Sequence, residues 1–343
     1  MASSVPSRKI GDANIGPLGY GLMWGVYDPK SLASSTDDER FKVLDAAVDA
    51  GCNFWDTADI YPGSEEAVGK WLAKTGRRKE VFLATKFGFA TRPGQEGYVI
   101  DGRPEYVREA FERSIKKLGV DYIDLYYLHR ADSKTPIERT VGAMAELVKE
   151  GKVKYIGLSE VSAKTLRRAH AVHPITAVQV EYSPFTLDIE DPNIGLLEAC
   201  RELGVKVVAY SPLGRGLLTG QFKSADDFTD FFRKNTPKYS AANFPKILKL
   251  IERLEAIGKK YNASSGQVAL AWILAQGDDI IPIPCTTKVK NLEHNIAAVN
   301  VKLSAEDVAD IRKHAEEIDA ALRGTARYPA GMQEQLFSET PEL

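Results

Sequence analysis

The sequence predicts a single (β/α)₈ barrel that takes in all 343 residues. Short apolar segments of strand length alternate along the chain with longer amphipathic segments of helical length. This pattern is typical of buried parallel strands joined by crossover helices. It gives eight strands, each followed by a helix, which is the number that a closed parallel barrel requires. No segment has the composition of a linker between domains, so we expect one domain.

The eight predicted strands are residues 18–22, 53–55, 81–85, 123–128, 153–158, 177–180, 205–210 and 280–283. Between them, apolar residues recur with helical spacing, and most of these segments stop at a glycine or a proline, which end helices. The eight predicted helices are residues 40–50, 65–74, 104–118, 137–149, 163–172, 194–203, 267–275 and 289–298.

A few segments lie outside this repeat. Residues 8–15 are expected to form a short hairpin that plugs the bottom of the barrel. Residues 222–261 are an insertion between the seventh strand and its helix. An extra charged helix over residues 304–322 begins at Ser304, a suitable N-cap, and a tail without clear periodicity follows over residues 323–343.

The main structural alternative is an open, doubly wound sheet that binds a dinucleotide. That fold predicts a Gly-x-Gly-x-x-Gly turn after the first strand, with a helix directly behind it. Residues 19–24 begin with two correctly spaced glycines but carry Trp24 at the sixth position, and no helical pattern follows at once. The sequence therefore argues against this fold.

The composition excludes several classes of function. Hydrophobic residues make up 44% and charged residues 27% of the chain, as in ordinary globular proteins. The formal net charge of -2 favours neither nucleic acid nor a membrane surface as a partner. The three cysteines have no CxxC spacing, which indicates a reducing compartment and no metal site. No apolar segment is long enough to span a bilayer, so we expect a cytoplasmic protein; its oligomeric state is left open.

Ionisable side chains of four types follow three consecutive predicted strands. Asp56 and Tyr61 come after the second strand, Lys86 after the third and His129 after the fourth. Catalytic groups of such barrels lie where the strands end, so we expect these four side chains at one mouth. Each of them alone is more often a loop cap or a solvated charge. Their coincidence at consecutive strand ends is what indicates a site.

This set of groups suits the protonation of an oxygen atom as hydride reaches a carbonyl carbon. Tyr61 is the predicted general acid, although a phenol with a pKa of about 10 exchanges protons poorly at neutral pH. We therefore expect Lys86 to lower the pKa of Tyr61, and Asp56 to hold Lys86 in place. His129 is expected to polarise and orient the substrate oxygen.

With these residues the sequence resembles the aldo-keto reductases over nearly its whole length. The resemblance implies a tyrosine acid, direct hydride transfer from NADP(H) to a small carbonyl substrate, and no metal. The chain looks nearer to a branch of fungal, plant and bacterial reductases of broad carbonyl range than to the mammalian steroid-reducing group. The motifs that carry the resemblance are Asp56-Thr57-Ala58 with Tyr61 and Gly63-Ser64-Glu65, Ala84-Thr85-Lys86, Asp124-Leu125-Tyr126 with His129, Gly157-Leu158-Ser159, and Tyr210-Ser211-Pro212-Leu213-Gly214.

The resemblance also implies an NADP(H) site at the ends of the later strands. Ser159 and Gln179 look like the pair that binds the nicotinamide carboxamide, and Tyr210 like the ring that stacks on the nicotinamide. Gln179 has a second interpretation, as a polar group satisfied inside the barrel. Small residues and backbone donors are expected near the pyrophosphate: Gly21, Ser211, Pro212, Leu213, Gly214 and Gly216.

The segment after the eighth strand is expected to bind the adenosine end. Thr286 and Lys288 precede a helix and would bind the 2′-phosphate, while Asn291 and Asn295 would face the adenine. Three positions depart from the pattern of the family. They are Glu160 where many relatives carry Asn, Cys285 where Gly is common, and His294 where an acidic residue is common. The preference for NADP over NAD therefore depends mainly on Lys288.

The substrate pocket is expected to be aromatic, which suits a broad or apolar range of carbonyl compounds. Its predicted walls are Trp24, Phe87 with the loop up to residue 98, residues 222–239 and the tail. Two other functions stay open. One is an accessory subunit that binds NADPH and turns over slowly, similar to the beta subunits of potassium channels. The other is a glycoside hydrolase that pairs Asp56 or Asp59 with Glu65.

Overall fold

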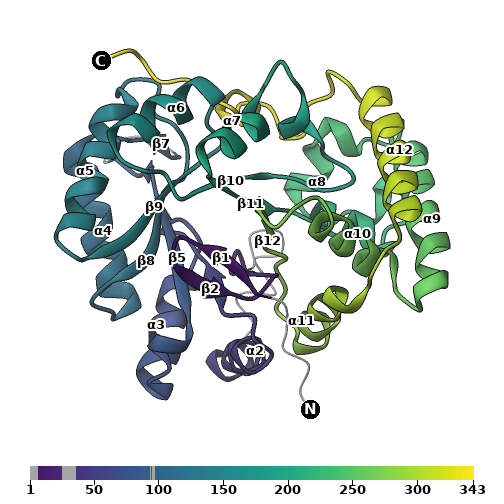
Figure 1. Cartoon of the computed structure of the whole chain (residues 1–343), viewed down its shortest axis with the longest axis horizontal. Helices are drawn as coiled ribbons and strands as arrows, with labels where there is room; N and C mark the ends of the chain where they lie inside the picture. The colour runs from purple at the N-terminus through teal and green to yellow at the C-terminus, as the bar shows by residue number, and fades with distance from the viewer. Residues whose placement is uncertain (1–6, 25–35, 93, 95–96) are drawn as a thin grey trace.

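The computed structural model describes residues 7–24, 36–92, 94 and 97–343 of the chain. Its centre is a ring of parallel strands surrounded by helices (Figure 1). The strands are β3 (Tyr20–Gly21), β4 (Phe54–Asp56), β5 (Phe82–Phe87), β8 (Ile123–Leu128), β9 (Val153–Ser159), β10 (Ala177–Glu181), β11 (Lys206–Tyr210) and β12 (Ile280–Pro282). They form one eight-stranded sheet in the order β12-β11-β10-β9-β8-β5-β4-β3, which confirms the predicted fold.

The two edges of this sheet meet at Gly21. This residue forms a parallel bridge with Cys285, just beyond β12, and its N–H donates to the Pro284 carbonyl at 3.1 Å. A Cβ atom at position 21 would lie 2.8 Å from the carbonyl oxygen of Ile283. The close approach of these two backbones therefore requires glycine at the point where the barrel closes.

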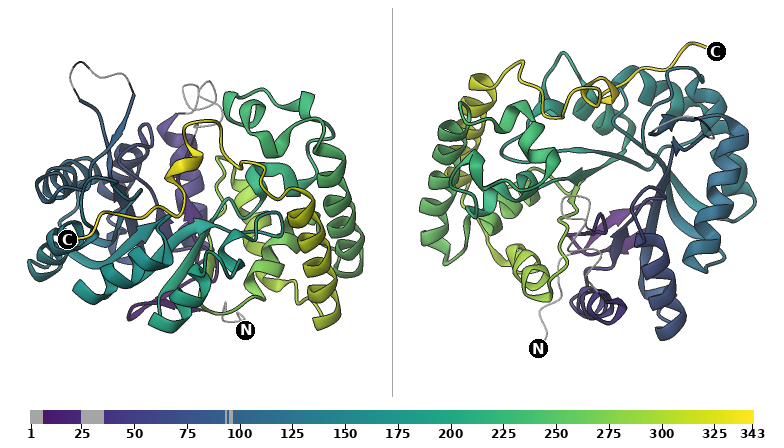
Figure 2. Two further views of the ribbon diagram at one scale, coloured as in Figure 1. Left: turned by 90° about the horizontal axis from the view of Figure 1, so that it is seen from above. Right: turned by 180° about the vertical axis from the view of Figure 1, so that it is seen from behind.

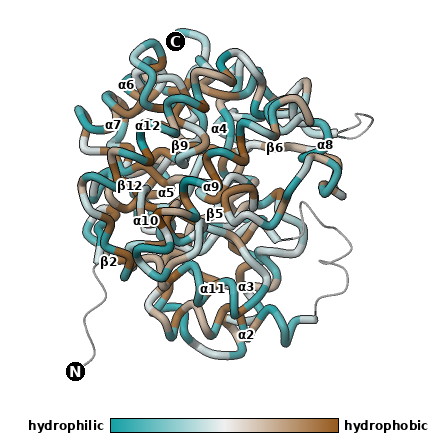
Figure 3. The backbone as a smooth tube through the Cα atoms, turned by 90° about the vertical axis from the view of Figure 1, so that its right-hand side faces the viewer, coloured by the Kyte–Doolittle hydropathy of each residue, from teal (hydrophilic) through white to brown (hydrophobic). Residues whose placement is uncertain are grey.

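Eight helices follow the strands, as predicted. They are α2 (Asp37–Asp49), α3 (Ser64–Thr75), α4 (Pro104–Leu118), α5 (Ile137–Lys149), α6 (Ala163–Val172), α7 (Leu196–Leu203), α10 (Ser265–Leu274) and α11 (Val289–Ile296). Hydrophobic and hydrophilic residues alternate along the tube that traces them (Figure 3), as expected for helices with one face on the barrel. The insertion contains α8 (Phe231–Asn235) and the 18-residue helix α9 (Phe244–Tyr261), which the sequence analysis did not predict.

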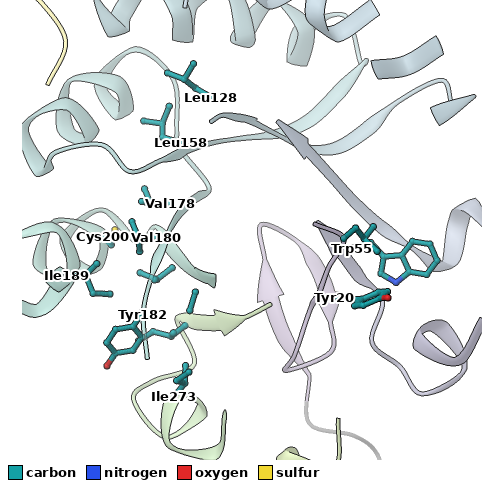
Figure 4. Packing of buried hydrophobic residues seen from close by; sticks show 14 of the residues in the cluster. Tyr20, Trp55, Leu128, Leu158, Val178, Val180, Tyr182, Ile189, Cys200 and Ile273 are labelled. Carbon is teal, nitrogen blue, oxygen red and sulfur yellow. The ribbon is translucent and has the colours of Figure 1, made fainter. Parts of the chain in front are cut away.

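The buried apolar residues form two main layers, because consecutive side chains of a strand point to opposite faces. The outer layer lies between strands and helices, and Figure 4 shows part of it, including Trp55, Leu128 and Val178. The hairpin of β1 (Arg8–Ile10) and β2 (Ala13–Ile15) packs on the inner layer, as predicted for a plug. The inner layer consists of Ile10, Ile15, Phe54, Phe82, Ala84, Leu125, Tyr127, Ala177, Val208, Ile281 and Ile283.

The C-terminal tail crosses the barrel after α12 (Ala305–Ala321) and ends on the side of α5 and α6 (Figures 1 and 2). Ser338 bridges to Val161, just after β9. The Thr340 hydroxyl accepts from the backbone N–H of Ile137 at 3.2 Å. The tail is therefore fixed at its far end and passes over the carboxyl ends of the strands.

Candidate active site

Strand periodicity directs several of the predicted site residues into the barrel. Side chains two positions apart on a strand share a face, and four predicted residues each stand two positions after a member of the inner layer. The pairs are Phe54 with Asp56, Ala84 with Lys86, Ala177 with Gln179, and Val208 with Tyr210. All four lie at or near the carboxyl ends of their strands, where the sequence analysis places the site.

Lys86 is the centre of this group. Its Nζ donates to Asp56 Oδ1 at 2.6 Å and to the Thr57 carbonyl at 2.7 Å, and lies 3.4 Å from the Tyr61 hydroxyl. Gln179 Nε2 donates to the second oxygen of Asp56 at 2.7 Å. The side chains of Lys86 and Asp56 are 0% and 2% exposed. One carboxylate oxygen of Asp56 therefore holds Lys86 near the Tyr61 hydroxyl, and the other accepts from Gln179.

The electrostatics of Tyr61 differ from the sequence prediction. Burial raises the pKa of Tyr61 well above its usual value, the Asp56 carboxylate adds to the rise, and the Arg130 guanidinium opposes it. The opposite charges of Lys86 and Asp56 act in opposite directions on the phenol. The net pKa of Tyr61 is therefore raised and not lowered, which corrects the expected outcome, while an effect of Lys86 on this pKa stays a prediction. Tyr61 is a protonated phenol at neutral pH.

His129 lies beside Tyr61 at the same mouth. Their ring centroids are 5.8 Å apart and the rings are nearly perpendicular, at 85°. Burial lowers the pKa of His129 well below its usual value, and the charges of Lys86 and Arg130 lower it further. The imidazole is therefore neutral at pH 7 and has one N–H to donate. Within the described residues its Nδ1 atom is buried without a hydrogen-bond partner.

Sequence reasoning missed a set of charged groups around Tyr210. The Tyr210 hydroxyl donates to Glu160 Oε1 at 2.7 Å and is 2.7 Å from the Tyr328 hydroxyl of the tail. Arg327, also in the tail, pairs with Glu160 at 3.1 Å and with Glu181 at 2.8 Å. The sequence analysis identifies Glu160 only as a departure from the family pattern and gives it no partner. The tail carried no periodicity that would have placed Arg327 and Tyr328 at the mouth.

The predicted pyrophosphate loop has the backbone of a tight turn. Ser211, Gly214 and Gly216 have φ values of 49°, 57° and 94°. The N–H of Gly214 donates to the Ser211 carbonyl at 2.8 Å, and that of Gly216 to the Leu213 carbonyl at 3.0 Å. These two donors are used inside the turn. The ligand contacts predicted for this loop, including Pro212, and for Gly21 stay predictions.

The other predicted cofactor residues lie in two places, at the end of β9 and around the start of α11. Ser159, at the end of β9, accepts from Arg130 Nη1 at 3.2 Å. Lys288 is the exposed N-cap of α11, and its backbone N–H donates to the Thr286 hydroxyl at 3.2 Å. On α11 itself Asn291 is exposed, whereas Asn295 is buried.

One predicted substrate residue does not line the mouth. Phe87 has the opposite strand parity to Lys86, is fully buried, and stacks on Tyr126 with centroids 4.8 Å apart. It belongs to the outer layer, so its predicted substrate contact is corrected. Phe89 replaces it at the mouth, with its ring centroid 5.0 Å from that of His129. Trp24 is buried and its indole N–H donates to the Tyr20 hydroxyl at 3.1 Å; a substrate contact by Trp24 stays a prediction.

The carboxylates of the hydrolase hypothesis do not face a common cleft. Asp56 is enclosed by Lys86 and Gln179. Glu65 is buried behind β5, where its Oε1 accepts from the Thr85 hydroxyl at 2.7 Å. Thr85 and Lys86 are neighbours on the strand and point to opposite faces, so Glu65 is outside the barrel. The structure therefore contradicts Asp56 and Glu65 as a pair of carboxylates flanking a glycosidic bond, and the pairing of Asp59 with Glu65 stays a hypothesis.

The carboxyl group of Asp59, next to the site, makes the folding stability of the protein depend on pH. Burial raises the pKa of Asp59 to about 7, and the nearby Glu65 carboxylate contributes to the rise. Among the described residues, its Oδ1 atom is enclosed without a hydrogen-bond partner. An unfolded chain loses this proton near pH 4, so folding stability falls as the pH rises from about 4 to about 7.

We expect Asp59→Asn to stabilise the protein at pH 8 and to leave its stability at pH 4 nearly unchanged. The gain at pH 8 is at most about 4 kcal/mol, which corresponds to the shift of about three pKa units. Thermal unfolding at the two pH values measures it, with the exposed Asp121→Asn as the matched control. An equal effect at both pH values would contradict the assigned protonation.

Comparison with known proteins agrees with this geometry. Residues 17–316 match the model of the Aldo/keto reductase family. The chain belongs to the aldo/keto reductase family. "Aldo-keto reductase str7" of Strobilurus tenacellus is 57% identical over 344 residues, which cover 99% of each chain. "Aldo-keto reductase yakc [NADP(+)]" of Schizosaccharomyces pombe is 48% identical over 345 residues, again 99% of each chain.

The fold of this aldo/keto reductase is also found in solved structures. The glycerol dehydrogenase AKR11B4 from Gluconobacter oxydans superposes with a TM-score of 0.79 at 28% identity, over 93% of this chain and 96% of that chain. The family assignment makes this aldo/keto reductase an oxidoreductase. Within its described residues, no helix is both long and apolar enough to cross a membrane.

Proposed function

We propose that this protein reduces aldehydes and ketones to alcohols with NADP(H), and that Tyr61 is the general acid. The observation that carries the proposal is the meeting of three groups at one mouth. These are the protonated Tyr61 hydroxyl, the neutral imidazole of His129 and the Lys86–Asp56 pair beneath the phenol. The name of the relative from Schizosaccharomyces pombe includes NADP(+), which supports the choice of cofactor.

The proton transfer follows from the positions of these side chains. A substrate oxygen between Tyr61 and His129 accepts one hydrogen bond from the phenol and one from the imidazole, which stabilise the negative charge that develops on it. Tyr61 then transfers its proton to that oxygen. Lys86 Nζ, 3.4 Å from the phenol oxygen, stabilises the phenolate left behind.

The residues at the later strand ends fit a nicotinamide dinucleotide phosphate. When bound, this cofactor supplies the hydride. The Lys288 ammonium is exposed and makes no ion pair among the described residues, so it is free to bind the 2′-phosphate with Thr286. We assign Ser159 and Gln179 to the carboxamide. Tyr210 is assigned to the nicotinamide ring, because its hydroxyl is held by Glu160 and Tyr328 and its ring orientation is thereby fixed.

Lys288→Ala tests the cofactor assignment. Only NADPH carries the 2′-phosphate, so we expect its dissociation constant to rise about 10- to 150-fold while that of NADH changes little. Titration of the two cofactors against both proteins measures this. Lys290→Ala, which removes a neighbouring exposed ammonium, is the control. Equal losses for NADPH and NADH would show that Lys288 acts on structure.

The proposed activity itself is tested with purified protein, NADPH and a panel of aldehydes and ketones, followed at the nicotinamide absorbance. Repeated turnover supports the proposal. Tight NADPH binding with oxidation of only one equivalent would instead indicate the accessory-subunit role.

A further inference from the structure

Within the part of the chain that the structure describes, Arg130 is a buried cation that forms no ion pair. The residue is 8% exposed, and its Nη1 donates to the His129 carbonyl at 2.8 Å and to the Ser159 hydroxyl at 3.2 Å. Both acceptors are neutral. Among the described residues, no carboxylate forms an ion pair with this guanidinium, and its Nε and Nη2 atoms have no hydrogen-bond acceptor. A buried charge in a protein is normally paired with an opposite charge. The guanidinium of Arg130 can therefore still bind an anion.

The nearby acidic group, Glu160, has partners of its own, although its charge also favours the charged form of Arg130. Glu160 is fully buried, and its oxygens are occupied by Arg327 at 3.1 Å and by the Tyr210 hydroxyl at 2.7 Å. The other groups whose charges act on Arg130 are the phenols of Tyr61, Tyr210 and Tyr328, which are neutral when protonated. Apart from Glu160, the groups that act on Arg130 are therefore hydroxyl groups, and among the described residues no carboxylate lies within ion-pair distance of its guanidinium.

The position of Arg130 points to the substrate as the source of this charge. The residue follows His129 at the end of β8. In the sheet, β8 is separated from β11 by β9 and β10, and from β12 by one strand more. The loops after β11 and β12 are those assigned to the phosphates of the cofactor. Arg130 instead lies next to the two groups, Tyr61 and His129, that are assigned to the carbonyl oxygen.

We propose that Arg130 is a specificity-determining residue that selects aldehydes and ketones carrying a carboxylate. The inference rests on the proposed carbonyl reductase function and names a substrate class for it. Two free N–H-bearing atoms of a planar guanidinium match the two oxygens of a carboxylate. Because two hydrogen bonds of Nη1 hold the guanidinium in place, little reorganisation opposes binding.

A matched pair of substrates tests this preference. 4-Carboxybenzaldehyde and 4-formylbenzamide have the same shape, and only the first is an anion at pH 7. We expect wild-type kcat/KM to favour the carboxylate about 10- to 150-fold. Arg130→Gln should bring the ratio of the two kcat/KM values close to one, and Arg130→Lys should retain part of it. Arg108→Gln, on the outer helix α4, should leave the ratio unchanged. A merely structural role of Arg130 would lower both kcat/KM values together and keep their ratio.

A binding measurement separates this inference from the reductase function. With NADP⁺-loaded protein, 4-(hydroxymethyl)benzoate should bind more tightly than 4-(hydroxymethyl)benzamide, and Arg130→Gln should remove the difference. If neither these aldehydes nor any other compound of the panel is reduced, the proposed function fails, and this binding difference still decides the role of Arg130. Equal binding of the two alcohols to wild type would overturn the inference. So would an Arg130→Gln variant that loses NADPH affinity and keeps the wild-type ratio.

Discussion

Tyr61→Phe is expected to lose most carbonyl reduction, by about 10²- to 10⁴-fold in kcat, which is the usual contribution of general acid catalysis. The change removes one hydroxyl and leaves the ring in place. NADPH binding should therefore stay near the wild-type value, which a fluorescence titration would show. Tyr98→Phe removes a phenol that is 59% exposed and serves as the control.

The pH dependence of this step follows from the protonation of Tyr61. The acid form is required, and burial keeps the pKa of Tyr61 well above its usual value. We therefore expect no loss of kcat from ionisation of Tyr61 between pH 7 and about pH 10. A Tyr61→Phe enzyme with nearly wild-type turnover would remove Tyr61 from the mechanism.

Lys86→Met is the second change with a large expected effect, again about 10²- to 10⁴-fold in kcat. It removes the ammonium 3.4 Å from the Tyr61 hydroxyl and leaves the Asp56 carboxylate buried without its cation. Leaving one member of a buried ion pair alone costs about 3–5 kcal/mol of folding stability. Burial alone raises the pKa of Asp56, so this loss should grow as the pH rises through the folded-state pKa.

The double variant Asp56→Asn with Lys86→Met separates the two effects. It removes both charges, so the melting temperature should recover relative to Lys86→Met, because no buried carboxylate is left unpaired. Activity should not recover, since the ammonium near Tyr61 is still absent. If Lys86→Met retains both the rate and the pH profile of wild type, Lys86 has no part in the chemistry.

Local sequence patterns were sufficient to predict the barrel and the position of its mouth. Short apolar segments predict the strands, and the glycines between the segments mark where the helices end. The carboxyl ends of the strands converge in this fold. Asp56, Lys86 and His129 could be placed in this way. The error at Phe87 has a simple cause, because the prediction took Phe87 as the start of the loop after the third strand, whereas it is the last residue of β5, directly after Lys86. Strand parity puts the two side chains on opposite faces.

Other features of the site depend on long-range packing. Arg327 and Tyr328 reach Glu160 and Tyr210 across more than a hundred residues of sequence, and no local pattern reports such a contact. The pKa of Tyr61 depends on burial and on the charges of Asp56 and Arg130 around it, and neither the burial nor these distances are visible in the residue types. Arg130 did carry a signal, since it directly follows the predicted His129, but its missing partner is apparent only in three dimensions.

The transfer of deuterium from labelled cofactor to product tests the central claim most directly. NADPH that carries deuterium at both C4 positions is incubated with the protein and 4-carboxybenzaldehyde in ordinary water, and the alcohol is analysed by mass spectrometry. Direct hydride transfer with a Tyr61 proton predicts one deuterium on the carbinol carbon of every product molecule, and a proton from solvent on its oxygen. An alcohol without carbon-bound deuterium, or no alcohol from this or any other carbonyl compound, would contradict the account.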